Sequence, residues 1–121
     1  MYTYRQSTGE LFHDGLPVTT GYSGHAEGRN NPALQSHPNV GPIPCGRWTI
    51  EKPAFESQTH GPVVMRLDPC AGTETFGRSG FLIHGDSILH PGMGSLGCII
   101  LPRPARLAIS ANPDCDLEVI P

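Results

Sequence analysis

Apolar residues along the chain stand in short runs, several of which alternate with polar residues and most of which end near glycine, proline, asparagine or aspartate. This pattern is typical of β-strands joined by tight turns. The N-terminal runs are expected to form a hairpin, with Asp14-Gly15 supplying the positive φ that a tight connection needs. The strands that the pattern predicts are residues 2–6, 10–12, 16–20, 47–50, 63–67, 81–84, 98–101 and 117–120.

Three other segments depart from this pattern. Residues 103–110 are predicted to form a helix, because Pro102 and Pro104 are acceptable at a helix start and the apolar positions that follow share one side. Residues 53–62 are polar and are expected to be a connection without a strand. Residues 25–40 form a long polar segment, which is expected to be either a substrate-facing flap or an ordered surface loop without a role.

The composition agrees with a single, mainly β domain over residues 1–121. The chain has 121 residues, of which 15 are glycine and 13 are proline, which suits many short strands and turns and argues against a helical bundle. The formal net charge is -3, and the Lys and Arg residues form no basic stripe. Nucleic-acid binding therefore has no electrostatic support.

The sequence contains neither a candidate membrane span nor a recognisable secretory signal. No apolar run approaches the ~20 residues of a membrane span, and residues 1–7 lack the charged-then-apolar order of a secretory signal. We therefore expect a protein made in the cytoplasm that either acts there or reaches another compartment by a route that reads no cleavable N-terminal signal.

The cysteines do not indicate a structural zinc site, because no Cys-x-x-Cys pair occurs. If Cys98 is a working thiol, the three others permit one disulfide in any of three pairings and leave one thiol over. These others are Cys45, Cys70 and Cys115.

One pair of stretches carries candidate chemistry. His84 ends an apolar run, and Cys98 follows a tight Ser-x-Gly turn that leads into another apolar run. A cysteine attacks as its thiolate, and a neighbouring imidazole can take the thiol proton and later donate it to a leaving amine. Gly97 lets the backbone bend so that N–H groups near Cys98 converge on an oxyanion, and Ser95 is expected to orient the loop or the substrate.

Plainer explanations remain open for the same residues. Cys98 taken alone is a small buried hydrophobe more often than a nucleophile, and His84 is compatible with a core histidine. A third alternative is a zinc-dependent hydrolase, since His84, Asp86, His90 and Cys98 supply suitable ligand atoms. A fourth is a catalytically inactive wall-binding or phage-structural module.

Two motifs resemble those of L,D-transpeptidase (YkuD-type) catalytic domains. Residues 41–50, Gly-Pro-Ile-Pro-Cys-Gly-Arg-Trp-Thr-Ile, resemble the family's Thr-Pro-x-Gly-x-aromatic-x-Ile segment. Residues 83–85 with 95–99 resemble its His-Gly and Ser/Thr-His-Gly-Cys signature. The N-terminal hairpin, Tyr-Ser-Gly at 22–24, Asn-Asn-Pro at 30–32 and residues 77–86 resemble a compact subgroup, the L,D-transpeptidase-like effectors of type VI secretion systems.

This resemblance implies a mainly β sandwich or barrel with one or two short helices, acting on peptidoglycan stem peptides without a cofactor or metal. Cys98 is then the nucleophile, His84 its base, and Gly85 offers a backbone carbonyl that orients the imidazole. Cleavage, D-amino-acid exchange and cross-linking are the reactions of such enzymes. The resemblance also implies delivery by a secretion apparatus, activity in the periplasm of target bacteria and a cognate immunity protein.

The sequence departs from the family pattern at two positions. Leu96 replaces the histidine of the Ser/Thr-His-Gly-Cys motif, and Ile100 replaces a polar residue that commonly follows the cysteine. We expect substrate handling to differ as a result, with Tyr22, Arg78 and Asp86 taking over part of the binding. For Arg78, the alternative is a solvated turn residue.

Overall fold

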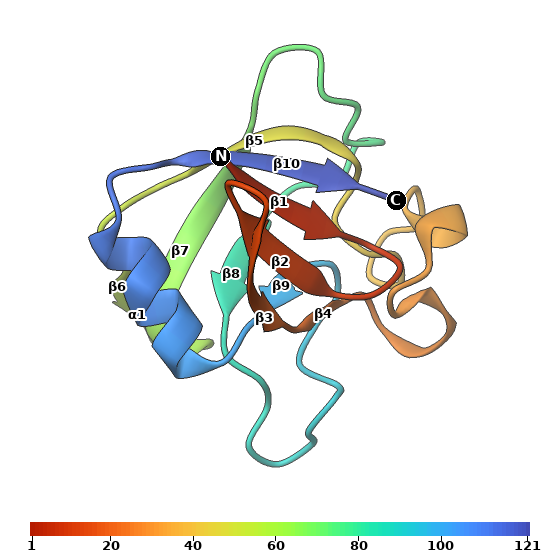
Figure 1. Ribbon diagram of the computed structural model, residues 1–121. Coiled ribbons are helices and arrows are strands. Elements are labelled where there is room, and N and C mark those ends of the chain that lie inside the picture. The colour runs from red at the N-terminus through yellow and green to blue at the C-terminus, as the bar shows by residue number, and fades with distance from the viewer.

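A computed structural model describes the whole chain, residues 1–121, as ten strands, one α-helix and two short 3-10 turns (Figure 1). The mainly β class is confirmed. The elements are β1 (Tyr2–Arg5), β2 (Glu10–His13), β3 (Leu16–Thr20), β4 (Tyr22–Ser23), η1 (Ala26–Gly28), η2 (Pro32–Leu34), β5 (Gly46–Ile50), β6 (Phe55–Ser57), β7 (Gly61–Pro69), β8 (Leu82–His84), β9 (Ile99–Ile100), α1 (Arg103–Ala111) and β10 (Asp116–Ile120).

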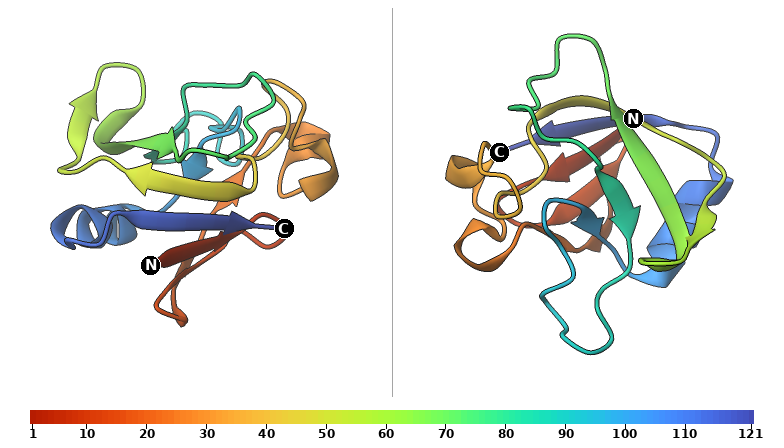
Figure 2. Two further views of the ribbon diagram at one scale, coloured as in Figure 1. Left: turned by 90° about the horizontal axis from the view of Figure 1, so that it is seen from above. Right: turned by 180° about the vertical axis from the view of Figure 1, so that it is seen from behind.

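The strands form one curved sheet in the order β3-β2-β1-β10-β5-β7-β8-β9-β4, with β6 paired to β7 (Figure 2). The pairs β1–β10 and β8–β9 are parallel, and the others are antiparallel. The two outer strands of this order, β3 and β4, are joined in the chain by Gly21 alone. The sheet therefore curves until the end of β3 lies at the start of β4, but β3 and β4 do not pair, so it stays open rather than closing into a barrel.

Gly21 makes this curvature possible because the backbones on both sides approach it closely. Its N–H donates to the Gly9 carbonyl at 2.8 Å. A Cβ on Gly21 would lie 1.8 Å from the Ile100 carbonyl oxygen, and a Cβ on Gly9 would lie 1.9 Å from the Gly21 oxygen. No side chain fits between the two edges at this point.

The core fills the inside of the curved sheet. Alternate residues of β1 and β10 point inward, and Trp48 meets Phe81 edge to face at a centroid distance of 5.1 Å. Helix α1 buries Ala105 and Ile109 and packs beside β7, as Figure 1 shows. The largest fully buried side chains are Trp48, Tyr4, Ile43, Ile50, Met65, Ile83, Ile99, Leu101, Ile109 and Leu117.

The predicted strands and helix are confirmed with small shifts of their ends, but two short strands were not predicted. Residues 53–62 contain β6, so the expected plain connection is wrong. Phe55 pairs with Val64 and lies under the Arg66 guanidinium at 4.2 Å, so β6 owes its form to β7 rather than to an alternating pattern. Tyr22–Ser23, which resembles a turn in sequence, becomes β4 by pairing with β9.

The polar segment 25–40 is an ordered loop. Both 3-10 turns lie within it, and its ends are tied by the bonds His25 N–H to Val40 O (2.8 Å) and Gly41 N–H to His37 O (3.0 Å). All four cysteines are free thiols. None of the helices has the length and apolar character of a membrane span.

Candidate active site

A cleft of about 460 Å³ opens where the β8 end, the turn before β9 and the loop 25–40 come together. It contains both residues of the candidate pair, His84 and Cys98. The residues around it are Pro38, Asn39, His60, Gly77, Arg78, Ser79, Gly80, Phe81, His84, Gly94, Leu96, Gly97 and Cys98. Since Pro38 and Asn39 belong to the polar segment, part of that segment does face the cleft.

The parallel pairing of β8 and β9 brings His84 and Cys98 together. Ile83 pairs with Ile99 and His84 with Ile100, and Cys98 directly precedes β9 with its thiol at the Leu82 N–H, two positions before His84. His84 is the last residue of β8, so both functional residues stand at strand ends that the parallel pairing brings together. Both side chains line the same cleft.

His84 is buried, with 4% of its surface exposed, and its ring orientation is fixed. Its Nδ1 lies 2.7 Å from the Gly85 carbonyl oxygen. A carbonyl only accepts hydrogen bonds, so Nδ1 carries the proton and Nε2 keeps a free lone pair. Burial lowers the pKa of His84, and the bond to Gly85 opposes this shift only in part. His84 is thus a neutral imidazole at pH 7, suited to accept a proton.

The Cys98 thiol is also held in its neutral form. Burial raises its pKa, while the Leu82 N–H and the charge of Arg78 act in the opposite direction. The Sγ atom lies 3.8 Å from the Gly80 carbonyl oxygen, and no hydrogen bond joins it to His84. The resting site is therefore a neutral thiol in one cleft with a neutral imidazole, and not a thiolate–imidazolium ion pair.

The turn before Cys98 is built around the buried hydroxyl of Ser95. Ser95 Oγ donates to the Cys98 carbonyl at 2.7 Å and accepts from the N–H groups of Gly97 and Gly24 at 3.0 and 2.9 Å. Because Ser95 is fully buried, it orients the turn and not the substrate. The Gly97 N–H is used within the turn, whereas that of Cys98 has no protein acceptor and is free for an oxyanion.

Gly97 is required at its position. Its φ is +138°, and a Cβ there would lie 2.4 Å from Arg78 Nη2. Arg78 is itself only 8% exposed, so the alternative of a solvated turn residue is wrong. Its guanidinium donates to the carbonyls of Gln35 (2.5 Å), Pro42 (2.8 Å), Gly41 (2.9 Å) and Leu96 (3.4 Å). Arg78 thus joins the loop 25–40 to the turn that carries Cys98.

Tyr22 and Asp86 lie outside this cleft. The Tyr22 hydroxyl donates to Asp86 Oδ1 at 2.5 Å and accepts from the Gly94 N–H at 2.8 Å. Asp86 also accepts from the N–H groups of Ser87 (2.8 Å) and Gly92 (3.0 Å). The two side chains therefore anchor the loop between β8 and β9, which projects from the sheet in Figure 1.

His60 is a cleft residue that sequence reasoning missed. It lies in the β6–β7 hairpin, and its ring centroid is 4.5 Å from that of His84. No motif surrounds it in the sequence, and only the folding of the hairpin over β8 brings it to the site. His60 also lines a second cleft, which it shares with His84.

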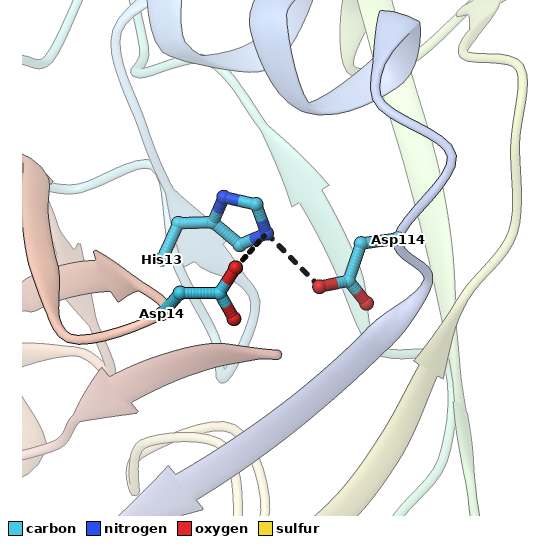
Figure 3. A group of neighbouring side chains, drawn as sticks. All are labelled: His13, Asp14 and Asp114. Atoms are coloured by element: carbon cyan, nitrogen blue, oxygen red, sulfur yellow. Dashed lines mark hydrogen bonds and ion pairs between the residues drawn. The ribbon is translucent and has the colours of Figure 1, made fainter.

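The four residues of the zinc alternative do not form a ligand set. Asp86 is turned toward Tyr22, and His84, Asp86, His90 and Cys98 are not among groups whose ligand atoms lie within 4.8 Å of one another. The group that meets this distance is His13, Asp14 and Asp114, none of which lines the Cys98 cleft (Figure 3). There the Met1 ammonium already pairs with both carboxylates at 2.6 Å.

Residues 18–113 match the family model of the Tlde1 domain. The chain belongs to the Tlde1 domain family. The matched residues include every residue that lines the Cys98 cleft. No curated protein and no solved structure shows significant similarity to the chain. Membership of the Tlde1 family supports a type VI secretion effector that acts on peptidoglycan, in agreement with the resemblance found in the sequence.

Proposed function

We propose that this Tlde1 domain is a cysteine enzyme that modifies peptidoglycan stem peptides by L,D-carboxypeptidase cleavage, by D-amino-acid exchange, or by both. The observation that carries the proposal is that Cys98 and His84 line one cleft at the ends of the paired strands β8 and β9. The sequence motifs around both residues, which resemble those of YkuD-type L,D-transpeptidases, support the same chemistry.

In the first half-reaction, His84 Nε2 takes the thiol proton as Cys98 Sγ bonds to the carbonyl carbon of an L-centred stem residue. The carbonyl π electrons move to the oxygen, which the free Cys98 N–H stabilises. The C–N bond to the terminal D-residue then breaks, its electrons go to nitrogen, and the His84 imidazolium returns the proton to that nitrogen. The products are a thioester on Cys98 and a free D-amino acid.

In the second half-reaction, a nucleophile attacks the thioester carbonyl while His84 Nε2 accepts its proton. Water gives the shortened peptide, and the amine of a D-amino acid gives an exchanged peptide. The C–S bond breaks in both cases, and the sulfur regains the proton from His84. Because both resting groups are neutral, the charges of the imidazolium and the tetrahedral oxyanion appear only during the reaction, inside a partly buried cleft.

The remaining site residues support this chemistry from outside the reacting atoms. Arg78 and Ser95 hold the turn that carries Cys98, and Tyr22 with Asp86 holds the following loop. We assign these four residues to positioning; Arg78 also lines the cleft, and direct substrate contact falls to it and the other residues of the cleft wall. Delivery by a secretion apparatus, action in the target periplasm and protection of the producer by an immunity protein complete the proposal.

Mass spectrometry of tetrapeptide muropeptides, with and without added D-amino acid, tests the chemistry. The native protein should remove the terminal D-residue or replace it, and Cys98→Ala should abolish both reactions. Cys45→Ala is the matched control, because Cys45 is a half-buried cysteine outside the cleft and should leave turnover unchanged. Full turnover by the folded Cys98→Ala protein would sink the proposal.

The neutral, half-buried thiol also favours one rival, a catalytically inactive wall-binding module. The same experiment separates the two, because an inactive module converts no muropeptide under any condition. Periplasm-directed expression adds a cellular test: the native chain should lyse or deform cells, and Cys98→Ala should not.

A further inference from the structure

A second cleft, of about 580 Å³, is lined by His84 but not by Cys98. It shares His60, His84 and Gly94 with the first cleft, so the two are continuous around the imidazole. Its far wall is formed by the first turn of α1, which contributes Arg103 and Arg106.

Arg106 is buried to an unusual degree for a charged residue, with 7% of its surface exposed. Its Nε donates to the Leu101 carbonyl at 3.0 Å, and its Nη1 donates to the carbonyls of Pro62 and Val63 at 2.7 and 3.1 Å. Nη2 has no protein acceptor, although this nitrogen lies against the cleft lining at Gly85. A Cβ on Gly85 would be 2.7 Å from it. The free nitrogen is therefore next to the residue that orients His84.

The two positive charges of this wall, on Arg103 and Arg106, have no ion-pair partner. Neither Arg103 nor Arg106 takes part in an ion pair, and the first turn of α1 contains no acidic residue. Asp86 is the one carboxylate in the cleft, and its oxygens already accept from Tyr22, Ser87 and Gly92. A buried guanidinium with a free donor and no counter-ion is a site for an anion, and a planar carboxylate suits its geometry.

We propose that the second cleft binds the carboxylate of the free amino acid that leaves or enters the reaction, with Arg106 Nη2 as donor and Arg103 as a supporting charge. This inference rests on the proposed function, since it takes His84 as the group that protonates the leaving amine. An amino acid with its amine at His84 carries its carboxylate only two bonds further on. Gly85 directly follows His84, and Arg106 Nη2 lies against Gly85 in the same cleft, where it can meet such a carboxylate.

The test is an NMR titration of the His60 and His84 ring signals in Cys98→Ala protein, which cannot turn over. D-Alanine at millimolar concentration should shift both signals saturably. D-Alaninamide has the same amine and side chain but no carboxylate, and should bind at least about tenfold more weakly. Equal binding of the two compounds, or tighter binding of inorganic phosphate than of D-alanine, overturns the carboxylate assignment.

Two arginine variants complete the design. Arg106→Gln should abolish D-alanine binding, but Arg106 also bonds three backbone carbonyls, so the variant is checked for folding. Arg103→Gln removes only an exposed charge and should weaken binding about twofold to fivefold. Arg47→Gln is the control, because Arg47 is exposed and lies outside the cleft. An Arg103→Gln protein that binds D-alanine like the control contradicts the supporting role.

The outcomes also separate this inference from the proposed function. Conversion of muropeptides by the native protein without D-alanine binding in the second cleft overturns the inference and leaves the function standing. D-Alanine binding with no conversion under any condition supports the anion site and removes the proposed function.

Discussion

Two histidine clusters of this molecule use the same side chain in opposite ways. The side chain of His13 is 25% exposed and lies 2.9 Å from the Asp114 carboxylate, with Asp14 beside it (Figure 3). Its ring also stacks on Tyr2 at 4.1 Å, and the Met1 ammonium pairs with both carboxylates. His84 is buried, meets a backbone carbonyl instead of a carboxylate and has a second imidazole, His60, against its ring.

The difference lies in what each environment does to charge. Around His13, anions and a cation neutralise one another, and the cluster ties β1, β2 and the start of β10 together. Around His84, the neutral form is favoured and one ring nitrogen stays free. A histidine surrounded by carboxylates is here a structural feature, whereas the one without them is placed to move a proton.

The largest expected contrast is in catalysis. His84→Ala should lower kcat/KM for tetrapeptide cleavage by about a hundredfold to ten-thousandfold, because the base that takes the thiol proton is lost. His13→Ala should leave the same constant within about twofold. Kinetics on purified muropeptides measures both. A comparable loss in the two variants would show that His84 has no special role.

The second contrast is in stability, and it compares Gly97, next to Cys98, with Gly15, next to Asp14. Gly97→Ala places a Cβ 2.4 Å from Arg78 Nη2 at a φ of +138°, and should destabilise the fold by about 2–4 kcal/mol. Gly15→Ala, next to Asp14, meets no atom within 4 Å and has only its φ of +82° to strain it, so about 1 kcal/mol is expected. Urea unfolding of both variants gives the comparison, and equal losses contradict the close contact at Gly97.

A smaller effect concerns His60. Replacing it with alanine uncovers His84, and burial is the main cause of the lowered His84 pKa. In the native protein, kcat/KM is expected to fall on the acid side below pH 6.5. In His60→Ala this fall should begin at higher pH, and kcat/KM should be about threefold to tenfold lower. His60→Phe keeps a ring in place and should retain most of the native profile. Identical profiles for native protein and His60→Ala would remove His60 from the site.

The smallest effect is an acid-sensitive contribution at the His13 cluster. The bonds of Asp114 to the Met1 ammonium, the Asp116 N–H and His13 hold its pKa well below the ordinary value. A lowered carboxyl pKa stabilises the fold above the unfolded value of about 3.9, and this contribution is lost as the pH falls below it. At pH 7, Asp114→Asn should therefore have a lower urea midpoint than the native protein. At pH 3, the difference between the two midpoints should be smaller. A constant difference would argue against the charge network.

Local patterns were enough for much of the fold and for the central pair. The runs before His84 and after Cys98 predict two strands, and the Ser-x-Gly turn predicts the bend that carries the thiol; both are present. The sequence does not reveal the role of Arg106, because Arg106 looks like an ordinary residue of an amphipathic helix. Its free nitrogen lies against Gly85, which is outside that helix. His60 depends likewise on a contact across the sheet. Such long-range contacts leave no local pattern.

The pairing of β1 with β10 has a consequence for how the molecule forms. Tyr2 pairs with Leu117, and β10 in turn pairs with β5, so the middle of the sheet needs both ends of the sequence at once. The chain must close a loop of nearly its full length before these contacts can form, which makes high contact order and slow folding the expectation. A nascent chain whose β10 is still inside the ribosome lacks the strand between β1 and β5, so its sheet stays incomplete until β10 emerges.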